Sequence, residues 1–138
     1  MDHYNVLIAE DEPAIRSQLR IWLEEYLPKR LPAKYVIYEA KDGTDVAARA
    51  EECRKLGKSL DLAIIDLAMP GRSGIEVIAD LRQASPSTRI VTLSATASLH
   101  AEQLQQRYGS EVKILDKPIG RAEFLDKIIE VLGGNHHA

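Results

Sequence analysis

The sequence predicts an α/β fold, in which helices pack on a mostly parallel sheet, and three observations lead to this prediction. Short runs rich in β-branched residues alternate with longer amphipathic segments along the whole chain. The segments LDLAIID and RIVTL are almost continuously apolar, as strands are when both faces of a sheet are covered. The chain has 138 residues, 45% hydrophobic and 28% charged, which suits one globular domain.

Five segments are predicted to be the strands, because each is a short apolar run bounded by turn-forming or charged residues. In chain order they are residues 5–9, 35–39, 60–65, 89–93 and 112–115.

The first helix follows the first strand, since apolar residues recur at helical spacing from Ile15 to Tyr26. Pro13 suits its first turn, where the missing N–H costs little, and Pro28 and Pro32 are predicted to mark its end. We expect Trp22 and Tyr26 to be packing residues of this helix rather than a binding platform.

Two capped helices come next. Asp42 and Gly43 offer a turn and cap for a second helix that reaches about Leu56. Ser73 and Glu76 have the spacing of a capping box for a third helix. The inward stripe expected for this third helix is Ile75, Ile78 and Leu81.

A fourth helix is expected over residues 98–108, with Leu99 and Leu104 almost its only large apolar residues, so a movable element is predicted there. A fifth helix, residues 121–132, has a continuous apolar face and stops at Gly133. Residues 1–133 are therefore expected to form the domain, and residues 134–138 a frayed tail or a cloning remnant.

Composition limits the partners. A net charge of −3 argues against a protein that binds nucleic acid directly through phosphate contacts. The chain shows no membrane-spanning run and no signal-peptide pattern at its start, and its one cysteine, Cys53, reads as a small buried hydrophobe. A cytoplasmic protein is expected.

Polar and charged residues follow four of the five predicted strands. Glu10, Asp11 and Glu12 follow the first, Asp66 the third, Ser94 the fourth, and Asp116 with Lys117 the fifth. In an open parallel sheet the carboxyl ends of the strands meet at one edge, where ligands bind. These side chains are therefore expected to converge.

Such a cluster needs positive charge. Two carboxylates about 5 Å apart, at an effective dielectric of about 20, repel by roughly 3 kcal/mol. The repulsion can be offset by Lys117, by a bound metal or by raised carboxylate pKa values. Oxygen ligands without histidine or cysteine favour Mg²⁺ (or Mn²⁺), and magnesium commonly shares its shell with a phosphate.

Each residue also has a purely structural interpretation. Asp66 alone could cap a turn, and Glu10 to Glu12 could be an acidic helix start favoured by the helix dipole. Ser94 could be an ordinary turn hydroxyl, and Lys117 a surface lysine.

Four motifs, IAEDEP, IIDLAMPGRSG, LSAT and LDKP, stand in this order along the chain. Together they resemble the bacterial two-component receiver domain, and the resemblance covers roughly residues 4–132. It implies a flavodoxin-like, doubly wound (βα)5 fold with the strand order 2-1-3-4-5.

The resemblance also implies roles for individual residues. Asp66 matches the phosphoacceptor, and Glu10 and Asp11 match the acidic pair that holds the metal together with Asp66 and the backbone carbonyl of Ala68. Ser94 and Lys117 match the hydroxyl and the lysine that contact the phosphoryl group. Pro118 matches a proline that often follows a cis bond.

Two positions depart from the family's pattern. Glu10 replaces the commoner aspartate, which could shift the metal's water shell. Ile114 stands where the family usually has a switch aromatic, so the usual coupling between hydroxyl and ring is in doubt.

The function that the resemblance implies is a switch rather than an enzyme. It takes phosphate from a sensor histidine kinase or a phosphotransfer protein, slowly hydrolyses its own acyl phosphate, and acts on an unknown output domain or protein, with a homodimer as one option. A metal-dependent phosphatase of the same fold is the alternative, although such an enzyme would want an aspartate where Ala68 stands. The second alternative is a flavodoxin-like protein that binds a cofactor. It would need a phosphate-binding loop after the first strand, but Glu10, Asp11 and Glu12 stand there and would repel a phosphate.

Overall fold

The computed structural model describes residues 3–30, 34–69, 71, 73–95 and 97–133. Strands and helices alternate along this part of the chain, and a short 3-10 turn, Gly109–Glu111, precedes the last strand. Their bounds are β1 His3–Ala9, α1 Pro13–Arg30, β2 Lys34–Ala40, α2 Gly43–Lys55, β3 Leu62–Asp66, α3 Gly74–Ala84, β4 Arg89–Ser94, α4 Ala97–Tyr108, β5 Val112–Asp116 and α5 Arg121–Gly133.

The strands form one parallel sheet in the order β2-β1-β3-β4-β5, as the resemblance implied. Ala9 pairs with Ala40 on one side and with Ile65 on the other, so the strands on either side of β1 end level with it. Ser94 is paired with Asp116 at the end of β4. All five carboxyl ends therefore lie along one edge of the sheet.

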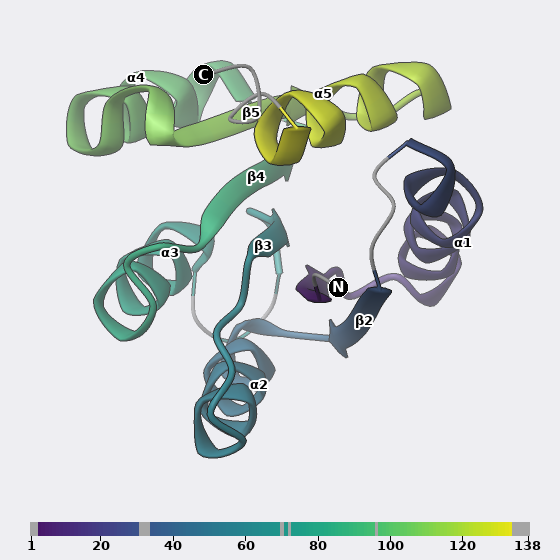
Figure 1. The fold of residues 1–138 in the computed structure, drawn as a ribbon. Helices are drawn as coiled ribbons and strands as arrows, with labels where there is room; N and C mark the ends of the chain where they lie inside the picture. Colours follow the sequence, from purple (N-terminus) through teal and green to yellow (C-terminus); the bar gives the residue numbers. More distant parts are fainter. Residues whose placement is uncertain (1–2, 31–33, 70, 72, 96, 134–138) are drawn as a thin grey trace.

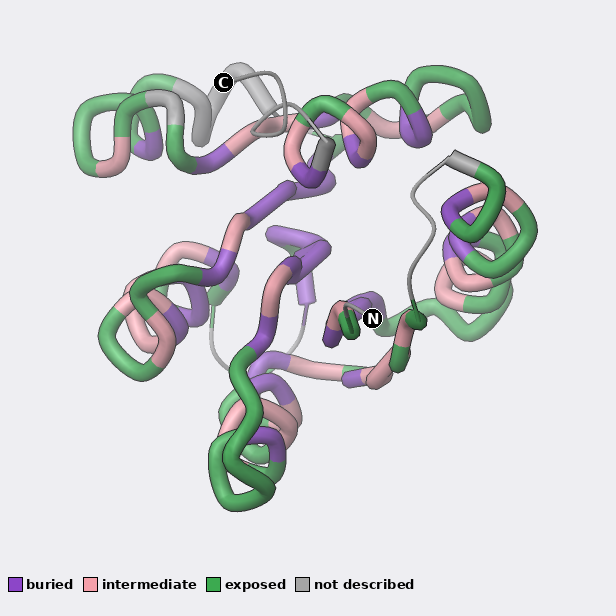
Figure 2. Tube along the Cα trace, in the orientation of Figure 1, coloured by how far each residue is buried: buried purple, intermediate pink, exposed green. Residues whose placement is uncertain are grey.

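Helices cover both faces, which gives three layers. α1 and α5 lie on one face, and α2, α3 and α4 lie on the other (Figure 1). Alternate strand residues point to opposite faces, so each face has its own core. Leu7 and Ile65 pack with α2, α3 and α4, whereas Ile8 and Ile64 pack with α1 and α5. The strands β1, β3 and β4 are mostly buried, whereas the edge strand β2 is mostly intermediate or exposed, and exposed residues lie on the outer sides of the helices (Figure 2).

The caps predicted for α2 and α3 are confirmed. The side chain of Asp42 accepts a hydrogen bond from the amide of Asp45 at 2.9 Å. Ser73 and Glu76 form the reciprocal bonds of a capping box, which satisfies amides that have no partner inside the helix. Gly57, just beyond the end of α2, has a φ of 73°, the left-handed conformation that glycine adopts without strain.

α1 ends at Arg30, between the two prolines predicted to mark its end, so Pro28 lies inside its last turns and does not end the helix. Leu27 is 1% exposed and packs with Leu19 and Leu23, and this anchor keeps the chain helical beside the proline. Pro32 lies outside the described residues.

Two smaller differences concern the ends and faces of elements. The inward stripe of α3 includes Val77, while Ile75 is only partly buried. β3, β4 and β5 each run one residue further than predicted, so Asp66, Ser94 and Asp116 are the last residues of their strands.

Cys53 is buried, as expected. Residues 134–138, expected to be a tail, lie outside the described residues. Within the described residues, no helix combines the length and the apolar character that crossing a membrane requires.

Candidate functional site

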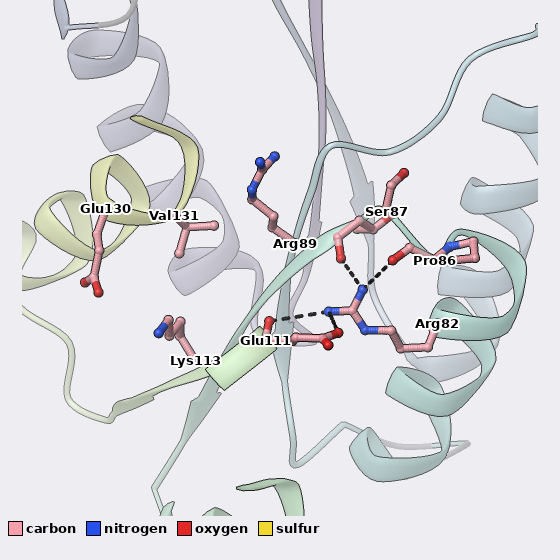
Figure 3. Close-up of a pocket in the computed structure, with 9 residues that line it drawn as sticks. Arg82, Pro86, Ser87, Arg89, Glu111, Lys113, Glu130 and Val131 are labelled. Carbon is pink, nitrogen blue, oxygen red and sulfur yellow. Dashed lines mark hydrogen bonds and ion pairs between the residues drawn. The ribbon is translucent and has the colours of Figure 1, made fainter. Parts of the chain in front are cut away.

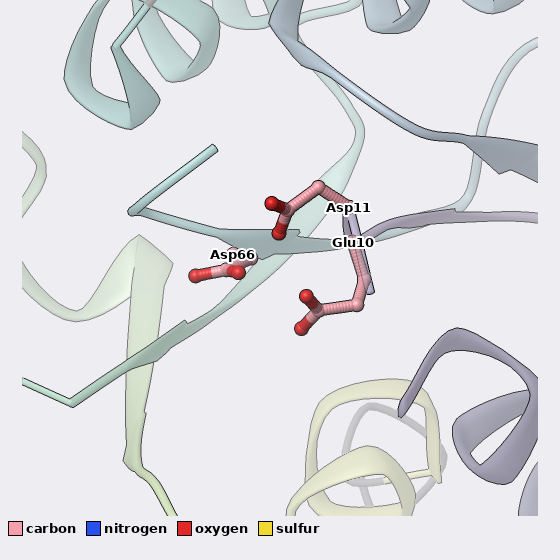
Figure 4. A group of neighbouring side chains, drawn as sticks. All are labelled: Glu10, Asp11 and Asp66. Carbon is pink, nitrogen blue, oxygen red and sulfur yellow. The ribbon is translucent and has the colours of Figure 1, made fainter. Parts of the chain in front are cut away.

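Three carboxylates meet at the carboxyl edge of the sheet. Glu10 and Asp11 directly follow β1, and Asp66 ends the neighbouring strand β3. One carboxylate oxygen of each lies within 4.8 Å of the other two, and the three side chains project to the same side (Figure 4). Glu10 is 0% exposed and Asp66 is 2% exposed, whereas Asp11 is open to solvent. The convergence predicted from the strand ends is therefore present.

Lys117 faces two of these carboxylates. Its Nζ lies 3.0 Å from Asp66 Oδ2 and 3.1 Å from Glu10 Oε1. Its amide donates to the carbonyl of Ser94 at 3.0 Å, which ties the residue after β5 to the end of β4, and the bond to Pro118 is cis. Burial lowers the pKa of Lys117, but its hydrogen bond to Asp66 and the negative charges of Asp66 and Glu10 outweigh burial, so the pKa is raised. Lys117 is thus a charged partner inside the cluster rather than a surface lysine.

Both oxygens of Asp66 are hydrogen-bonded. Oδ2 accepts from the ammonium of Lys117, and Oδ1 accepts from the amide of Ala68 at 3.0 Å. The amide of Ala68 belongs to the turn that follows β3, so this bond also orients the turn. These two hydrogen bonds hold the carboxylate of Asp66 in one orientation at the carboxyl edge of the sheet.

The burial of Glu10 beside other charged groups changes the pKa of its carboxyl group. Burial, with the charge and hydrogen bonding of Asp66, raises the pKa of Glu10 to about 7, although the amide of Glu12 and the ammonium of Lys117 oppose the rise. Glu12 donates its amide to Glu10 Oε2 at 3.2 Å. Oε1 is buried and has no aligned hydrogen-bond donor among the described residues. One buried oxygen of the cluster is therefore ion-paired but not hydrogen-bonded.

The remaining predicted residues lie around this cluster. Ser94 is 1% exposed at the end of β4, beside Lys117, so it is not a loop hydroxyl. Asp116 and Ala68 are exposed at the same edge, and Glu12 is exposed near the start of α1. Ile114, at the position of the switch aromatic, is partly buried against the core that α2, α3 and α4 cover.

Arg16 and Glu39 connect β2 to the turn that contains Glu10 and Asp11, a link that was not predicted from the sequence. Arg16 Nη1 donates to the carbonyl of Glu10 at 2.8 Å, and Arg16 Nε lies 2.8 Å from Glu39 Oε1. Glu39 is the last residue but one of β2. Glu39 lies inside the predicted second strand rather than after it, so a rule based on the residues that follow each strand does not point to it.

Two hollows differ in their distance from the cluster. An apolar hollow of about 540 Å³ adjoins it, since its lining includes Lys117 and Pro118 together with Ile15, Trp22 and Ile119. A polar hollow of about 440 Å³ lies by the opposite ends of β4 and β5 (Figure 3). In the polar hollow, Arg82 already donates to the carbonyls of Pro86 and Thr88, at 2.8 Å and 2.7 Å. The carboxyl edge of the sheet, where the three carboxylates and Lys117 lie, is therefore the candidate functional site.

The sequence profile of the response regulator receiver domain family matches residues 6–129. The transcriptional regulatory protein ResD of Bacillus subtilis is 36% identical over 98 residues, which are 69% of this chain and 35% of ResD. The glycerol metabolism activator of Pseudomonas putida is 28% identical over 137 residues, which are 96% of this chain and 55% of that protein. The chain thus spans about a third to a half of the lengths of these relatives.

Solved structures agree in fold. A CheY-like receiver domain protein from Methanospirillum hungatei superposes with a TM-score of 0.77 at 21% identity, covering 99% of this chain and 98% of that one. The response regulator TrrA of Thermotoga maritima, solved in complex with Mg²⁺-BeF, gives a TM-score of 0.71 at 26% identity, covering 94% of this chain and 99% of that one. With the sequence match over residues 6–129, these findings show that the chain belongs to the response-regulator receiver domain family of two-component signalling.

Proposed function

We propose that this receiver is a phosphorylation switch in which Asp66 accepts a phosphoryl group from a sensor histidine kinase or a phosphotransfer protein. The observation that carries the proposal is one buried carboxylate, Asp66, grouped with two further carboxylates and ion-paired to Lys117 at the carboxyl edge of a parallel sheet. We propose that residues 1–133 form the receiver domain that carries out this reaction.

Glu10, Asp11 and Asp66 would hold Mg²⁺ (or Mn²⁺), with the backbone carbonyl of Ala68 as a fourth protein ligand. The donor set fits a hard cation, because all the side-chain ligands are carboxylate oxygens. The buried Oε1 of Glu10, which lacks an aligned hydrogen-bond donor, also suits a site completed by a cation or its water. When bound, the cation would supply positive charge to the oxygens of the transferring phosphoryl group.

Asp66 would act as the nucleophile. A carboxylate oxygen of Asp66 forms the new bond to phosphorus, while the bond from phosphorus to the donor's histidine nitrogen breaks and that nitrogen keeps the electron pair. The hydrogen bonds from Ala68 and Lys117 fix the carboxylate before reaction, so little reorientation is needed. Later attack of water on phosphorus would release inorganic phosphate and regenerate the carboxylate.

Lys117 and Ser94 would then change partners. The phosphoryl group brings about two negative charges and three acceptor oxygens to a place where Lys117 already pairs with Asp66. Its ammonium would move onto a phosphoryl oxygen, and the hydroxyl of Ser94, at the end of β4, would turn toward the same group. This exchange of contacts is what would bias the surface formed by α4, β5 and α5.

The phosphoryl donor would dock over the apolar hollow beside the site. Ile15 and Trp22 of α1 line this hollow together with Pro118 and Ile119, and Lys117 belongs to both the hollow and the acidic cluster. A helix of the donor seated there would bring its phosphohistidine next to Asp66. Continuity with the site is the reason for choosing the donor as the occupant.

Intact mass spectrometry after incubation with acetyl phosphate and Mg²⁺ tests this function. A phosphoryl adduct of about 80 Da is expected, and both Asp66→Asn and removal of the metal should abolish it. An adduct that persists in Asp66→Asn would overturn the role of Asp66. Steady turnover of a generic phosphate ester would instead favour the phosphatase, which Ala68, in place of a second aspartate, argues against.

A further inference from the structure

The main chain of Glu10 is held on both sides by groups outside β1. Its amide donates to the carbonyl of Ala40 at 3.1 Å, and its carbonyl accepts from Arg16 Nη1 at 2.8 Å. Glu10 is 0% exposed, and a buried carbonyl without a donor is costly. Because β1 ends at Ala9, Arg16 supplies the donor at this point of the chain.

Arg16 is itself fixed by Glu39. Arg16 Nε lies 2.8 Å from Glu39 Oε1, and Arg20 Nη1 lies 2.6 Å from the other oxygen of the same carboxylate. Burial raises the pKa of Glu39, but the two arginines outweigh it and lower the pKa below its ordinary value. Glu39 therefore stays ionised at neutral pH, and its charge orients the guanidinium that reaches Glu10.

We propose that Arg16 is a positioning residue for the acidic pair, which it holds through the backbone carbonyl of Glu10 rather than through a side chain. The carbonyl belongs to the peptide unit that joins Glu10 to Asp11, so fixing it sets the directions in which both side chains leave the chain. The inference rests on the metal site proposed above.

Charge explains why such a clamp is needed. The three carboxylates repel one another, and among the described residues Lys117 forms ion pairs with Glu10 and Asp66 but not with Asp11. Asp11 is exposed, so its direction depends on the main chain. Without Arg16 the peptide between Glu10 and Asp11 could rotate and relieve the repulsion, and the carboxylates would then have to be gathered again when the metal binds.

Arg20 provides a matched control. Replacing Arg20 by alanine removes an ion pair with the same Glu39 carboxylate, but it leaves the hydrogen bond from Arg16 to the Glu10 carbonyl in place. Isothermal titration of the full chain with Mg²⁺ should show a dissociation constant about tenfold higher for Arg16→Ala, as for other groups that orient metal ligands, and a change within about twofold for Arg20→Ala. Circular dichroism of the metal-free proteins checks that each variant is folded.

Arg16→Lys completes the test. Arg16 reaches the Glu10 carbonyl and Glu39 with two different nitrogens of one planar guanidinium, a geometry that a lysine ammonium does not reproduce. The dissociation constant of Arg16→Lys should therefore lie between those of the unaltered protein and Arg16→Ala; if Arg16→Ala does not fold, Arg16→Lys decides. Equal dissociation constants for the unaltered protein and the folded Arg16 variants, or equal losses for Arg16→Ala and Arg20→Ala, would overturn the role of Arg16 alone. No Mg²⁺ binding by the unaltered protein would overturn the metal site itself.

Discussion

At the scale of single residues, the site has more negative charge than its one lysine can balance. Lys117 faces Glu10 and Asp66, and Asp11 adds a third carboxylate nearby. Glu10 is the deepest of the three, and burial with the neighbouring charge of Asp66 raises its pKa to about 7. In the absence of metal, Glu10 therefore holds a proton for part of the time at neutral pH, and a divalent cation must displace it.

The affinity for Mg²⁺ should therefore depend on pH through Glu10. Below pH 7 the carboxyl of Glu10 is mostly protonated and neutral, so the dissociation constant should rise as the pH falls through about 7. Titrations at a series of pH values measure this. Glu10→Gln should bind more weakly at neutral pH and lose most of the dependence in this range. An unchanged pH profile in Glu10→Gln would show that another group titrates.

At the scale of elements, the acidic edge is set by how α3 packs against the turn after β3. A Cβ built on Gly74, the first residue of α3, would lie 2.6 Å from both Cα and Cδ2 of Leu67. Leu67 stands between Asp66 and Ala68, which are the proposed nucleophile and the donor to it. Glycine at this position lets the helix start close to the turn.

Gly74→Ala should destabilise the protein by about 1–3 kcal/mol, because the methyl group must displace the backbone at Leu67. Urea unfolding monitored through Trp22 measures the change. Gly120→Ala is the matched control, since a Cβ there meets nothing within 4 Å and φ is not in the left-handed region. The stability of this variant should change by less than about 0.5 kcal/mol. Gly120 directly precedes α5, where alanine is a poorer helix cap than glycine, but alanine also reduces the freedom of the unfolded chain, and the two effects oppose each other. Equal losses in both variants would contradict the account.

Sequence patterns predicted elements well where local chemistry decides, and less well where packing decides. The caps at Asp42 and Ser73 were predictable because cap and helix are neighbours in the chain. The continuation of α1 through Pro28 was not, because the contact of Leu27 with Leu19 and Leu23 outweighs a local breaking tendency. The carboxylates could be placed from strand ends, but the bond from Arg16 to a backbone carbonyl leaves no signal in residue type.

At the scale of the whole molecule, the parallel sheet gathers residues far apart in the chain, and α4 lies at the opposite end of the sheet from β2 (Figure 1). Of the α4 side chains that the structure describes, residues 102–108, only Leu104 is buried and Tyr108 is partly buried. By contrast α3 buries Gly74, Val77, Ile78 and Leu81. The weak anchoring of residues 102–108 is the physical reason to expect that α4 moves when the site is phosphorylated.

Hydrogen exchange of the metal-free protein should therefore be faster in α4 than in α3. The amide exchange of both helices can be followed by mass spectrometry in one sample, so α3 serves as the internal control. Mg²⁺ with beryllofluoride, a stand-in for the phosphoryl group, should change the exchange of α4 and leave that of α3 nearly unaltered. Equal protection of α4 and α3 in both the metal-free and the ligand-bound protein would contradict the prediction that α4 is the responsive element.

Asp66 is the proposed acceptor of the phosphoryl group, and locating the modified residue in the chain decides whether it is. After incubation with acetyl phosphate and Mg²⁺, reduction with borohydride converts an aspartyl phosphate to homoserine, which peptide sequencing by mass spectrometry can place in the chain. We expect homoserine at position 66, dependent on Mg²⁺ and absent from protein incubated without acetyl phosphate. Homoserine at Asp11 or at any other aspartate, with Asp66 unmodified, would contradict the account.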